Sequence, residues 1–599
     1  DSTGLRAGQY LGSVIVTSNA GSFEVPMALL VTSANASLLL GQTGVRFLAN
    51  DNSSGAPPQV VPVLNVGASG SSFIYSVNLV NGSEWLRVSA SSTPVTSSSP
   101  GAITLTPIPG TPRSPSPRYA LIRIDAPNTQ GAPSFITAVL DPALPGAVPQ
   151  PNPSGIFFTG ATRSGTGVQT VRLDTNNSTA VSFQTSVTGG SWLTATPAQG
   201  STSSTNPGSI NVAFDATNLL PGIYTGGVNI AIGATVRVVN VTLVVTTQAS
   251  SAGREMSTVR EAGCAPSKLA LVSTGLPGNF SVPAAWPASL VIRMADDCGS
   301  LVSNGKVIVS FSNGDPPVTL ISDRVTGTYS GTWNVGTVSS SMTVTATGTS
   351  TGLPAATTTL VGGVNVNPTP PPTIAQNGVL HNSDPRLGGA LAPGNVVAVF
   401  GSGLASQTTS PGVIPLANSF NGTEVVVGGV DAPLYFLSPG QLNIQIPYEL
   451  SPLSTYQIVA IVNNAVSNPQ SIDLVAQVPG ITSFADGRLI AQHADFTLVS
   501  ASSPAKPGEI LVMYLAGMGF TSTPVRSGTL SPATQVTVPA TVTVDGINAE
   551  VFYAGLTPGG IGLYQINFRV PTSVKAGNVK VQVIQGPSSS NVTTLPVVP

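Results

Sequence analysis

The chain has 599 residues, only 8% of them are charged, and the formal net charge at pH 7 is −2. An average soluble protein carries about 25% charged residues, and this composition offers neither a basic surface for nucleic acid nor a lysine cluster for anionic lipid. No stretch of about 18 uninterrupted apolar residues occurs, so a membrane-spanning helix is not expected.

The apolar residues come in short alternating runs, as in Gly12-Ser-Val-Ile-Val-Thr17, and 64 glycines and 52 prolines supply turns between them. Frequent β-branched runs separated by turn residues are typical of sandwiches and barrels. A chain of this length exceeds one hydrophobic core and predicts about four to six domains. We therefore predict an all-β protein, built as an elongated string of tandem Ig-like β-sandwich domains.

The first predicted module is incomplete. The order of residue types from Asp1 to Tyr10 matches that from Asp215 to Tyr224. The second of these segments lies in the middle of a later repeat. Residues 1–35 are therefore interpreted as a half-domain, whose open edge costs stability and invites pairing. Either the sequence is a fragment, or a neighbouring molecule supplies the missing strands.

Two complete repeats follow, each marked by a Trp-Leu pair. Trp85 and Trp192 are 107 residues apart (192 − 85), a spacing that fits one β-sandwich domain. In the second repeat, a closing valine-rich strand follows the motif Gly222-Ile-Tyr-Thr-Gly226. This pattern resembles the BACON domain, an Ig-like sandwich common in secreted bacterial proteins, over residues 149–248 and, in a more divergent form, over residues 36–148.

The BACON resemblance implies carbohydrate or mucin binding, although many such domains look like spacers. Trp85 and Trp192 recur at repeat-equivalent positions, which favours core packing for both. A contact with carbohydrate is the alternative interpretation, and it would need an exposed ring. Trp286 and Trp333 are interpreted as core residues in the same way.

A polar linker at 249–262 belongs to the next predicted domain, residues 249–367. Its motif Gly327-Thr-Tyr-Ser-Gly-Thr-Trp333 is similar to bacterial Ig-like domains of the invasin type, which are stalk units in adhesins. The two cysteines of the chain, Cys264 and Cys298, lie here, 34 residues apart. An even number of cysteines in an exported β-rich chain favours a disulfide between them, with two unrelated buried thiols as the alternative.

The segment Asn367-Pro-Thr-Pro-Pro-Pro-Thr373 predicts an extended spacer and the clearest boundary in the chain. A second pair of repeats follows it, at residues 368–478 and 479–599. In these repeats, Leu391-Ala-Pro-Gly parallels Ala505-Lys-Pro-Gly, with a period of about 115 residues.

The first of these repeats contains Gly401-x-Gly-Leu404 and Pro439-Gly-Gln-x-Asn-x-Gln-x-Pro447, and the second contains the hairpin signal Asp545-Gly546. The tandem pair resembles the uncharacterised C-terminal domain of large secreted proteins of Acidobacteria (Solibacter type). The resemblance implies a source and export but no reaction. The terminal placement of such domains suggests sorting, anchoring or assembly.

Three features of the sequence are candidate sites of chemistry. Gly348-Thr-Ser-Thr-Gly352 matches a nucleophile elbow, but that elbow needs a strand turning into a helix, and this segment is predicted to be β. His381 and His493 have no nearby cysteine and are interpreted as solvated or hydrogen-bonded loop residues. Asp296-Asp297 is interpreted as a turn that caps a strand, with a weak calcium site as the alternative. We therefore predict no catalytic residue, cofactor or metal site, and a chain that is not an enzyme.

The leading functional hypothesis is an extracellular or cell-surface structural or adhesive rod. Because weak charge gives little repulsion between copies, we expect head-to-tail self-association into a fibre or filament, with strand complementation at residues 1–35 as one route. The alternative is an array of carbohydrate-binding modules that tethers a cell or an upstream enzyme to polysaccharide. A third hypothesis is an accessory part of a larger secreted enzyme. Nucleic acid is not an expected partner.

Overall fold

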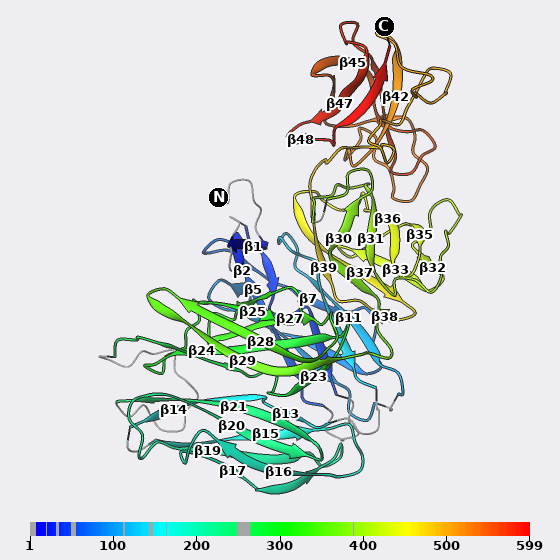
Figure 1. Ribbon diagram of the computed structural model, residues 1–599. Helices are drawn as coiled ribbons and strands as arrows, with labels where there is room; N and C mark the ends of the chain where they lie inside the picture. The colour runs from blue at the N-terminus through cyan, green and yellow to red at the C-terminus, as the bar shows by residue number, and fades with distance from the viewer. Residues whose placement is uncertain are drawn as a thin grey trace. The chain divides into compact units, whose positions relative to one another are not determined.

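The computed structural model of the chain describes residues 8–18, 21–31, 35–48, 56–111, 114–142, 148–162, 165–247, 264–386 and 388–598. Every regular element in these ranges is a β-strand (Figure 1), which confirms the all-β fold class. The chain divides into two compact units, Asp1–Pro370 and Pro371–Pro599. The division lies inside the proline-rich segment that the sequence marks as the clearest boundary.

The first unit begins with a hairpin of β1 (Gly8–Ser18) and β2 (Gly21–Val31). The two strands pair antiparallel along their whole length and form a sheet of their own. The half-domain expected at residues 1–35, and its completion by strands of a neighbouring molecule, stay predictions.

Module A, residues 35–142, has two four-stranded sheets, in the orders β3-β5-β10-β8 and β4-β12-β11-β7, and a short β6-β9 pair. Burial alternates along β10, where Ile103 and Leu105 point into the core. This period of two is the pattern of a strand with one buried face. The strands are β3 (Leu38–Leu40), β4 (Gly44–Phe47), β5 (Gln59–Asn65), β6 (Ser72–Phe73), β7 (Ser76–Leu79), β8 (Leu86–Ala90), β9 (Val95–Thr96), β10 (Gly101–Pro107), β11 (Arg118–Asp125) and β12 (Ser134–Leu140).

Module B, residues 148–247, has sheets in the orders β13-β15-β19-β17 and β14-β21-β20-β16-β18. Its strand β21 ends in six consecutive buried residues, so both faces of the sheet are covered there. The strands are β13 (Gln150–Asn152), β14 (Gly155–Ala161), β15 (Thr166–Asp174), β16 (Val181–Thr188), β17 (Leu193–Thr196), β18 (Gln199–Thr202), β19 (Gly208–Asp215), β20 (Gly222–Ile232) and β21 (Thr235–Thr246).

Module C, residues 264–366, is one continuous path of eight strands in the order β22-β24-β27-β26-β25-β28-β29-β23. Trp333 lies in its core, where its ring stacks on Phe311 at 4.5 Å between centroids. The strands are β22 (Leu269–Ser273), β23 (Phe280–Pro283), β24 (Pro287–Asp296), β25 (Lys306–Phe311), β26 (Val318–Ser322), β27 (Thr328–Asn334), β28 (Ser339–Ser350) and β29 (Leu353–Asn365).

Module D, residues 371–478, opens the second unit. It has a sheet in the order β30-β31-β36-β35 and a second sheet around β33 and β37. The strands are β30 (Thr373–His381), β31 (Val396–Ser402), β32 (Ser419–Phe420), β33 (Thr423–Val427), β34 (Val430–Asp431), β35 (Leu434–Leu437), β36 (Gln441–Gln445), β37 (Ser454–Val462), β38 (Ala465–Val466) and β39 (Gln470–Leu474).

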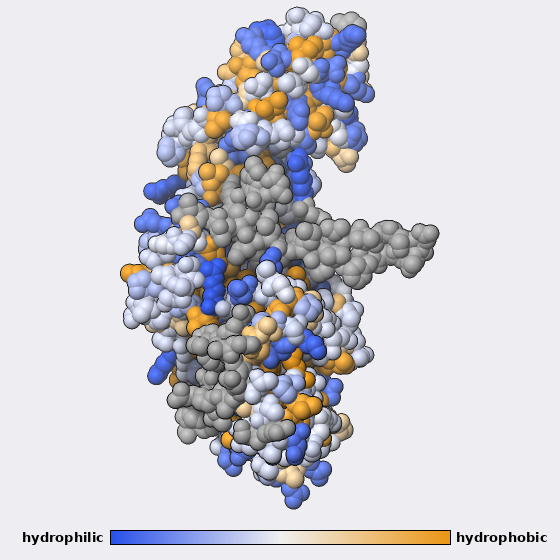
Figure 2. All heavy atoms as spheres, turned by 90° about the vertical axis from the view of Figure 1, so that its left-hand side faces the viewer, coloured by the Kyte–Doolittle hydropathy of each residue, from blue (hydrophilic) through white to orange (hydrophobic). Residues whose placement is uncertain are grey.

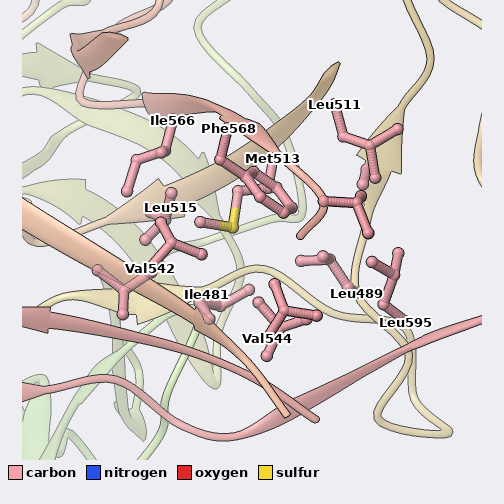
Figure 3. Packing of buried hydrophobic residues seen from close by; sticks show 14 of the residues in the cluster. Ile481, Leu489, Leu511, Met513, Leu515, Val542, Val544, Ile566, Phe568 and Leu595 are labelled. Atoms are coloured by element: carbon pink, nitrogen blue, oxygen red, sulfur yellow. The ribbon is translucent and has the colours of Figure 1, made fainter. Parts of the chain in front are cut away.

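Module E, residues 479–598, follows a path of seven strands, β40-β42-β46-β45-β44-β47-β48, to which β41, β43 and β49 add. Figure 3 shows its core, where Met513, Phe568 and Leu515 point toward one another. The strands are β40 (Gly480–Ile481), β41 (Ala491–Gln492), β42 (Ile510–Ala516), β43 (Thr534–Gln535), β44 (Ala540–Val544), β45 (Ile547–Leu556), β46 (Tyr564–Arg569), β47 (Gly577–Gln585), β48 (Ser588–Ser589) and β49 (Thr593–Val597).

The turn between β44 and β45 agrees with the primed hairpin expected at Asp545-Gly546. Asp545 and Gly546 have φ angles of 51° and 78°, and a type I′ turn requires positive φ at both central residues. Among the described strands, each sheet stays within one module. No sheet of the described strands crosses residues 148, 248, 367 or 478. The domain bounds expected from the sequence stay predictions.

Candidate interaction surfaces

The predicted disulfide between Cys264 and Cys298 is present, with the two Cα atoms 5.9 Å apart. It ties the segment before β22 to the turn after β24, at a place where Cys298 is buried. Closing a loop with a sequence separation of 34 residues restricts the unfolded chain, which stabilises module C by roughly 3–4 kcal/mol.

The adjacent carboxylates Asp296 and Asp297 bind different segments: Asp296 binds the turn after β24, and Asp297 binds the segment before β22. The buried Asp296 accepts the backbone N–H of Cys298 at 3.0 Å and that of Ser300 at 2.9 Å. Asp297 accepts the backbone N–H of Ser267 at 2.9 Å and its hydroxyl at 2.6 Å. This arrangement agrees with the capped turn expected from the sequence. Within the described residues, no group of three or more His, Cys, Asp or Glu side chains could hold a metal ion.

The repeated tryptophans Trp85 and Trp192 are core residues, with exposed fractions of 0% and 5%. Trp85 Nε1 donates to the Tyr119 carbonyl at 3.3 Å, and Trp192 Nε1 donates to the Gly189 carbonyl at 2.8 Å. The N–H group of each indole therefore has a hydrogen-bond acceptor inside its own sandwich. The alternative interpretation, a carbohydrate contact at Trp85 and Trp192, needs an exposed ring, and neither residue presents one.

One junction joins modules A and C, which are separated in sequence by module B. Trp286, 4% exposed, donates from Nε1 to the Tyr119 hydroxyl at 3.1 Å. The guanidinium of Arg46 lies 5.4 Å from the centroid of the Trp286 ring, and it pairs with Asp141 through contacts of 2.5 and 2.6 Å. Burial raises the pKa of Tyr119 to about 12, so the hydroxyl keeps its proton at neutral pH.

Backbone groups complete the junction between modules A and C. The Thr332 hydroxyl accepts the N–H groups of Thr43 and Gly44, each at 3.0 Å, and donates to the Gly44 carbonyl at 3.2 Å. The Arg324 guanidinium donates to the Ser97 carbonyl at 3.0 Å. Through these contacts, module C packs on a module that is not its sequence neighbour. Trp286 is buried as predicted, but between two modules.

Another junction joins modules B and C. Val238 and Gly278 exchange two backbone hydrogen bonds, of 3.0 and 2.8 Å. Beside this bridge, Phe157 and Val244 of module B form an apolar cluster with Ala270 and other residues of module C. The cluster explains why β21 is buried on both faces, since its outer side is covered by the neighbouring module.

His381 lies at the junction of modules D and E. Its Nδ1 accepts the backbone N–H groups of Ser383 and Asp384, both at 3.1 Å, and its Nε2 lies 3.1 Å from the Val478 carbonyl. Burial lowers the pKa of His381, which keeps the ring neutral. A Cβ on Gly480 would lie 2.4 Å from His381 Cε1, so glycine permits this close packing. The sequence interpretation of His381 as a hydrogen-bonded loop residue missed its burial between modules.

The same junction also contains a group of polar side chains from both modules. Gln445 accepts the N–H of Gly528 at 2.7 Å, and the hydroxyls of Tyr448 and Tyr564 are 3.0 Å apart. Glu449 accepts the Ser527 hydroxyl at 2.7 Å. Burial raises the pKa values of both tyrosines. The two tyrosine hydroxyls therefore stay protonated at neutral pH, and side-chain hydrogen bonds link module D to module E here.

His493 makes a separate, more exposed pair with Glu509, with 2.7 Å between Nδ1 and Oε1. Its Nε2 lies 3.1 Å from the Ser503 carbonyl. Burial opposes protonation of His493, but the hydrogen bond and charge of Glu509 outweigh it and raise the pKa of the imidazole. The pair fixes the loop around β41 to the start of β42.

The segment Gly348-Thr-Ser-Thr-Gly352 forms the end of a β-hairpin, where Ser350 pairs with Leu353 and Gly352 has a φ of 80°. It therefore lacks the strand-to-helix turn of a nucleophile elbow. Helices that are long and apolar enough to span a bilayer do not occur among the described residues. Figure 2 shows one face of the molecule, on which hydrophobic residues lie in small groups between hydrophilic ones.

Residues 152–246 match the family described as the viral BACON domain. This match lies inside the predicted repeat at 149–248 and confirms a BACON-like domain there. The resemblances of the other modules, to the divergent BACON domain, the invasin type and the Acidobacteria domain, stay predictions. No curated protein matches the sequence of this chain.

Several solved structures are similar to parts of the chain. SGBP-B of the Bacteroides ovatus mixed-linkage glucan utilization locus, in complex with a heptasaccharide, matches at 12% identity and a TM-score of 0.24, over 56% of this chain and 71% of that chain. Domains 4–9 of the surface layer protein SbsC match at 10% identity and a TM-score of 0.23, over 100% and 92%. The human desmocollin-1 ectodomain matches at 9% identity and a TM-score of 0.13, over 79% and 86%. TM-scores this low carry no argument about function.

Proposed function

We propose that this chain is an extracellular structural or adhesive scaffold without catalytic activity. The observation that supports it best is that module C makes side-chain and backbone contacts with two other modules. Trp286 is held by groups of module A, and Gly278 is bridged to module B. Side chains that are committed to such junctions hold sandwiches in fixed positions, which is a requirement of a scaffold and not of a flexible linker.

The disulfide supports an extracellular location, because disulfides persist in oxidising compartments. The histidines are held by structural hydrogen bonds, which supports a non-catalytic role: His381 packs at a module junction and His493 fixes a loop. The resemblance of modules D and E to a domain of secreted Acidobacteria proteins supports export from a bacterial cell.

Within this function we propose that the chain self-associates head to tail into a surface filament. A net charge of −2 on 599 residues leaves little repulsion between copies. Negative-stain electron microscopy of purified chain at increasing concentration tests this assembly, and filaments are the expected result. Isolated particles at every concentration would contradict assembly.

The scaffold itself is tested on native cells. We expect antibodies against modules D and E to label intact cells, and we expect the chain to stay with the cell envelope on fractionation. Recovery of the chain only from the cytosol, with its cysteines reduced, would contradict an extracellular scaffold. Carbohydrate binding is the second candidate function, and a specific arrangement in modules D and E favours it.

A further inference from the structure

Modules D and E each expose two amide side chains on the outer face of a central strand. In module D these are Gln441 and Asn443 on β36, and in module E they are Gln565 and Asn567 on β46. All four are partly exposed, and the residues between them are buried. Figure 3 shows Ile566 pointing into the core of module E, so the amides on either side of it face away from the core.

In both modules the glutamine donates to the asparagine. The distance from Nε2 of Gln441 to Oδ1 of Asn443 is 2.7 Å, and the corresponding distance from Gln565 to Asn567 is 3.1 Å. The hydrogen bond fixes the orientation of both amide planes. Among the described residues, it leaves the Oε1 of each glutamine and the Nδ2 of each asparagine without a protein partner. One free acceptor therefore stands beside one free donor on each module.

Aromatic rings flank both amide pairs at equivalent positions. On one neighbouring strand, Phe400 lies opposite the glutamine of module D, and Tyr514 lies opposite that of module E. On the other neighbouring strand, Phe436 and Tyr553 lie opposite the two asparagines. All four aromatic residues are partly exposed, with Phe400 at 38%. We call each set of two amides and two aromatic residues an amide–aromatic band.

Neighbouring positions on the same strands differ between the modules. Two residues beyond the asparagine, module D has Gln445 and module E has Arg569. Immediately before the flanking aromatic residue, module D has Tyr435 and module E has Phe552. Many other cross-strand pairs of side chains would stabilise the sheet as well as these do, so sheet stability alone does not require amides and aromatic rings here. The two amides and the aromatic character of their flanks therefore recur in both modules, while the position two residues beyond the asparagine differs.

We propose that the amide–aromatic bands of modules D and E bind a neutral polysaccharide. Each sugar hydroxyl is both a donor and an acceptor, so two adjacent hydroxyls match the free acceptor and free donor of a band. The flanking rings offer apolar surface to the C–H faces of the sugar rings. No member of either band is charged, which favours an uncharged glycan over an anionic one. Two bands on one chain give avidity for a polymer that reaches both.

Affinity electrophoresis of the full chain tests the proposal, with mixed-linkage β-glucan, xyloglucan, glucomannan and pullulan as neutral probes and alginate as the anionic probe. We expect at least one neutral gel to retard the chain and alginate to leave it unretarded. A variant with both amide pairs replaced, Q441A/N443A/Q565A/N567A, should lose this retardation. Either double variant alone should weaken binding about tenfold or more, through lost avidity.

Matched variants separate binding from folding. N211A removes an exposed strand amide that faces only threonines, Thr170 and Thr196, and it should leave the retardation unchanged. Tyr514→Phe keeps the ring and should bind, whereas Tyr514→Ala should not bind at that band. Circular dichroism and thermal midpoints must match those of the parent chain for each comparison.

Three results would overturn the proposal: no retardation by any neutral probe, equal retardation by alginate, or undiminished binding by the quadruple variant. None of these bears on surface labelling or filament formation. Failure of glycan binding is therefore distinguishable from failure of the scaffold function.

Discussion

At the scale of single residues, the two histidines of the second unit have pKa values shifted in opposite directions. Their contributions to stability therefore change with pH in opposite directions. Burial lowers the pKa of His381 and keeps its ring neutral, with Nδ1 accepting two backbone N–H groups. His493 has a raised pKa because its protonated form is paired with Glu509. A histidine in an unfolded chain titrates near pH 6.5, so the sign of each contribution to stability can be stated.

For His381, the unfolded state binds a proton more readily than the folded state. The free energy of unfolding therefore falls as the pH drops below about 6.5. We expect H381Q to lower the thermal midpoint at pH 7.5 and to lose less further stability between pH 7.5 and pH 5.5 than the parent chain. Differential scanning fluorimetry across this range measures both effects.

For His493, the folded state binds the proton more tightly. Its contribution is complete below about pH 6.5 and is lost as the pH rises through the folded-state pKa. We therefore expect H493Q to cost more stability at pH 5.5 than at pH 7.5, which makes it a control of opposite sign for H381Q. Identical pH profiles for the two variants would contradict both assignments.

Trp286 carries the junction between modules A and C, and its replacement tests that role. Truncating a buried tryptophan typically costs about 3–5 kcal/mol, so W286A should destabilise module C and release module A from it. Tyr119→Phe removes only the hydroxyl that accepts from Trp286, at a cost of about 1 kcal/mol. Hydrogen exchange at the backbone N–H groups of Thr43 and Gly44 reports the junction directly. Unchanged protection of these two groups in W286A would contradict the assignment.

At the scale of the element, the disulfide fixes the first strand of module C. The bridge lies next to the pairing of β22 with β24, so its removal loosens an edge strand that also packs on module B. We expect the C264S/C298S variant to unfold in module C at lower urea concentration, with a loss of roughly 3–4 kcal/mol. Reducing agent should reproduce this loss in the parent chain and have no effect on the variant.

The strands themselves could largely be predicted from the sequence. The alternation of apolar and polar residues and the Gly and Pro turns gave the all-β class, and Asp545-Gly546 gave the primed turn. The disulfide followed from the cysteine count, and the BACON-like module from the Trp-Leu and Gly-x-Tyr-x-Gly motifs. Each of these features depends on residues that are close in sequence or on a repeat that can be counted.

The junctions could not be predicted in the same way. Alternation indicates that one face of a strand is buried, but not which surface covers the other face, so the covered outer side of β21 had no sequence signal. Trp286 was expected in the core of its own module because tryptophan is usually buried. The amide–aromatic bands were also missed, since they combine residues from three strands that meet only in the folded sheet.

At the scale of the whole molecule, the weak charge bears on the proposed self-association. The chain has 22 basic and 24 acidic residues, several of which are used in internal pairs such as Arg46–Asp141 and Arg172–Asp174. In the proposed filament, contacts between copies would therefore depend on polar and apolar groups. Such contacts are only weakly screened by salt.

We expect the self-association of the chain to change little between 50 and 500 mM NaCl. Sedimentation velocity at a fixed protein concentration measures this. A steep loss of association at the higher salt concentration would show that charge pairs hold the copies together. That result would contradict the weakly charged interface.

The contacts of module C with modules A and B also affect what happens when the backbone is cut. A protease that cut the chain between modules A and B, or between modules B and C, would sever a covalent connection while leaving the Trp286 and Gly278 contacts intact. The resulting fragments would stay together as one particle. Such cuts would leave the first unit assembled, because the order of contacts in space differs from the order of modules along the chain.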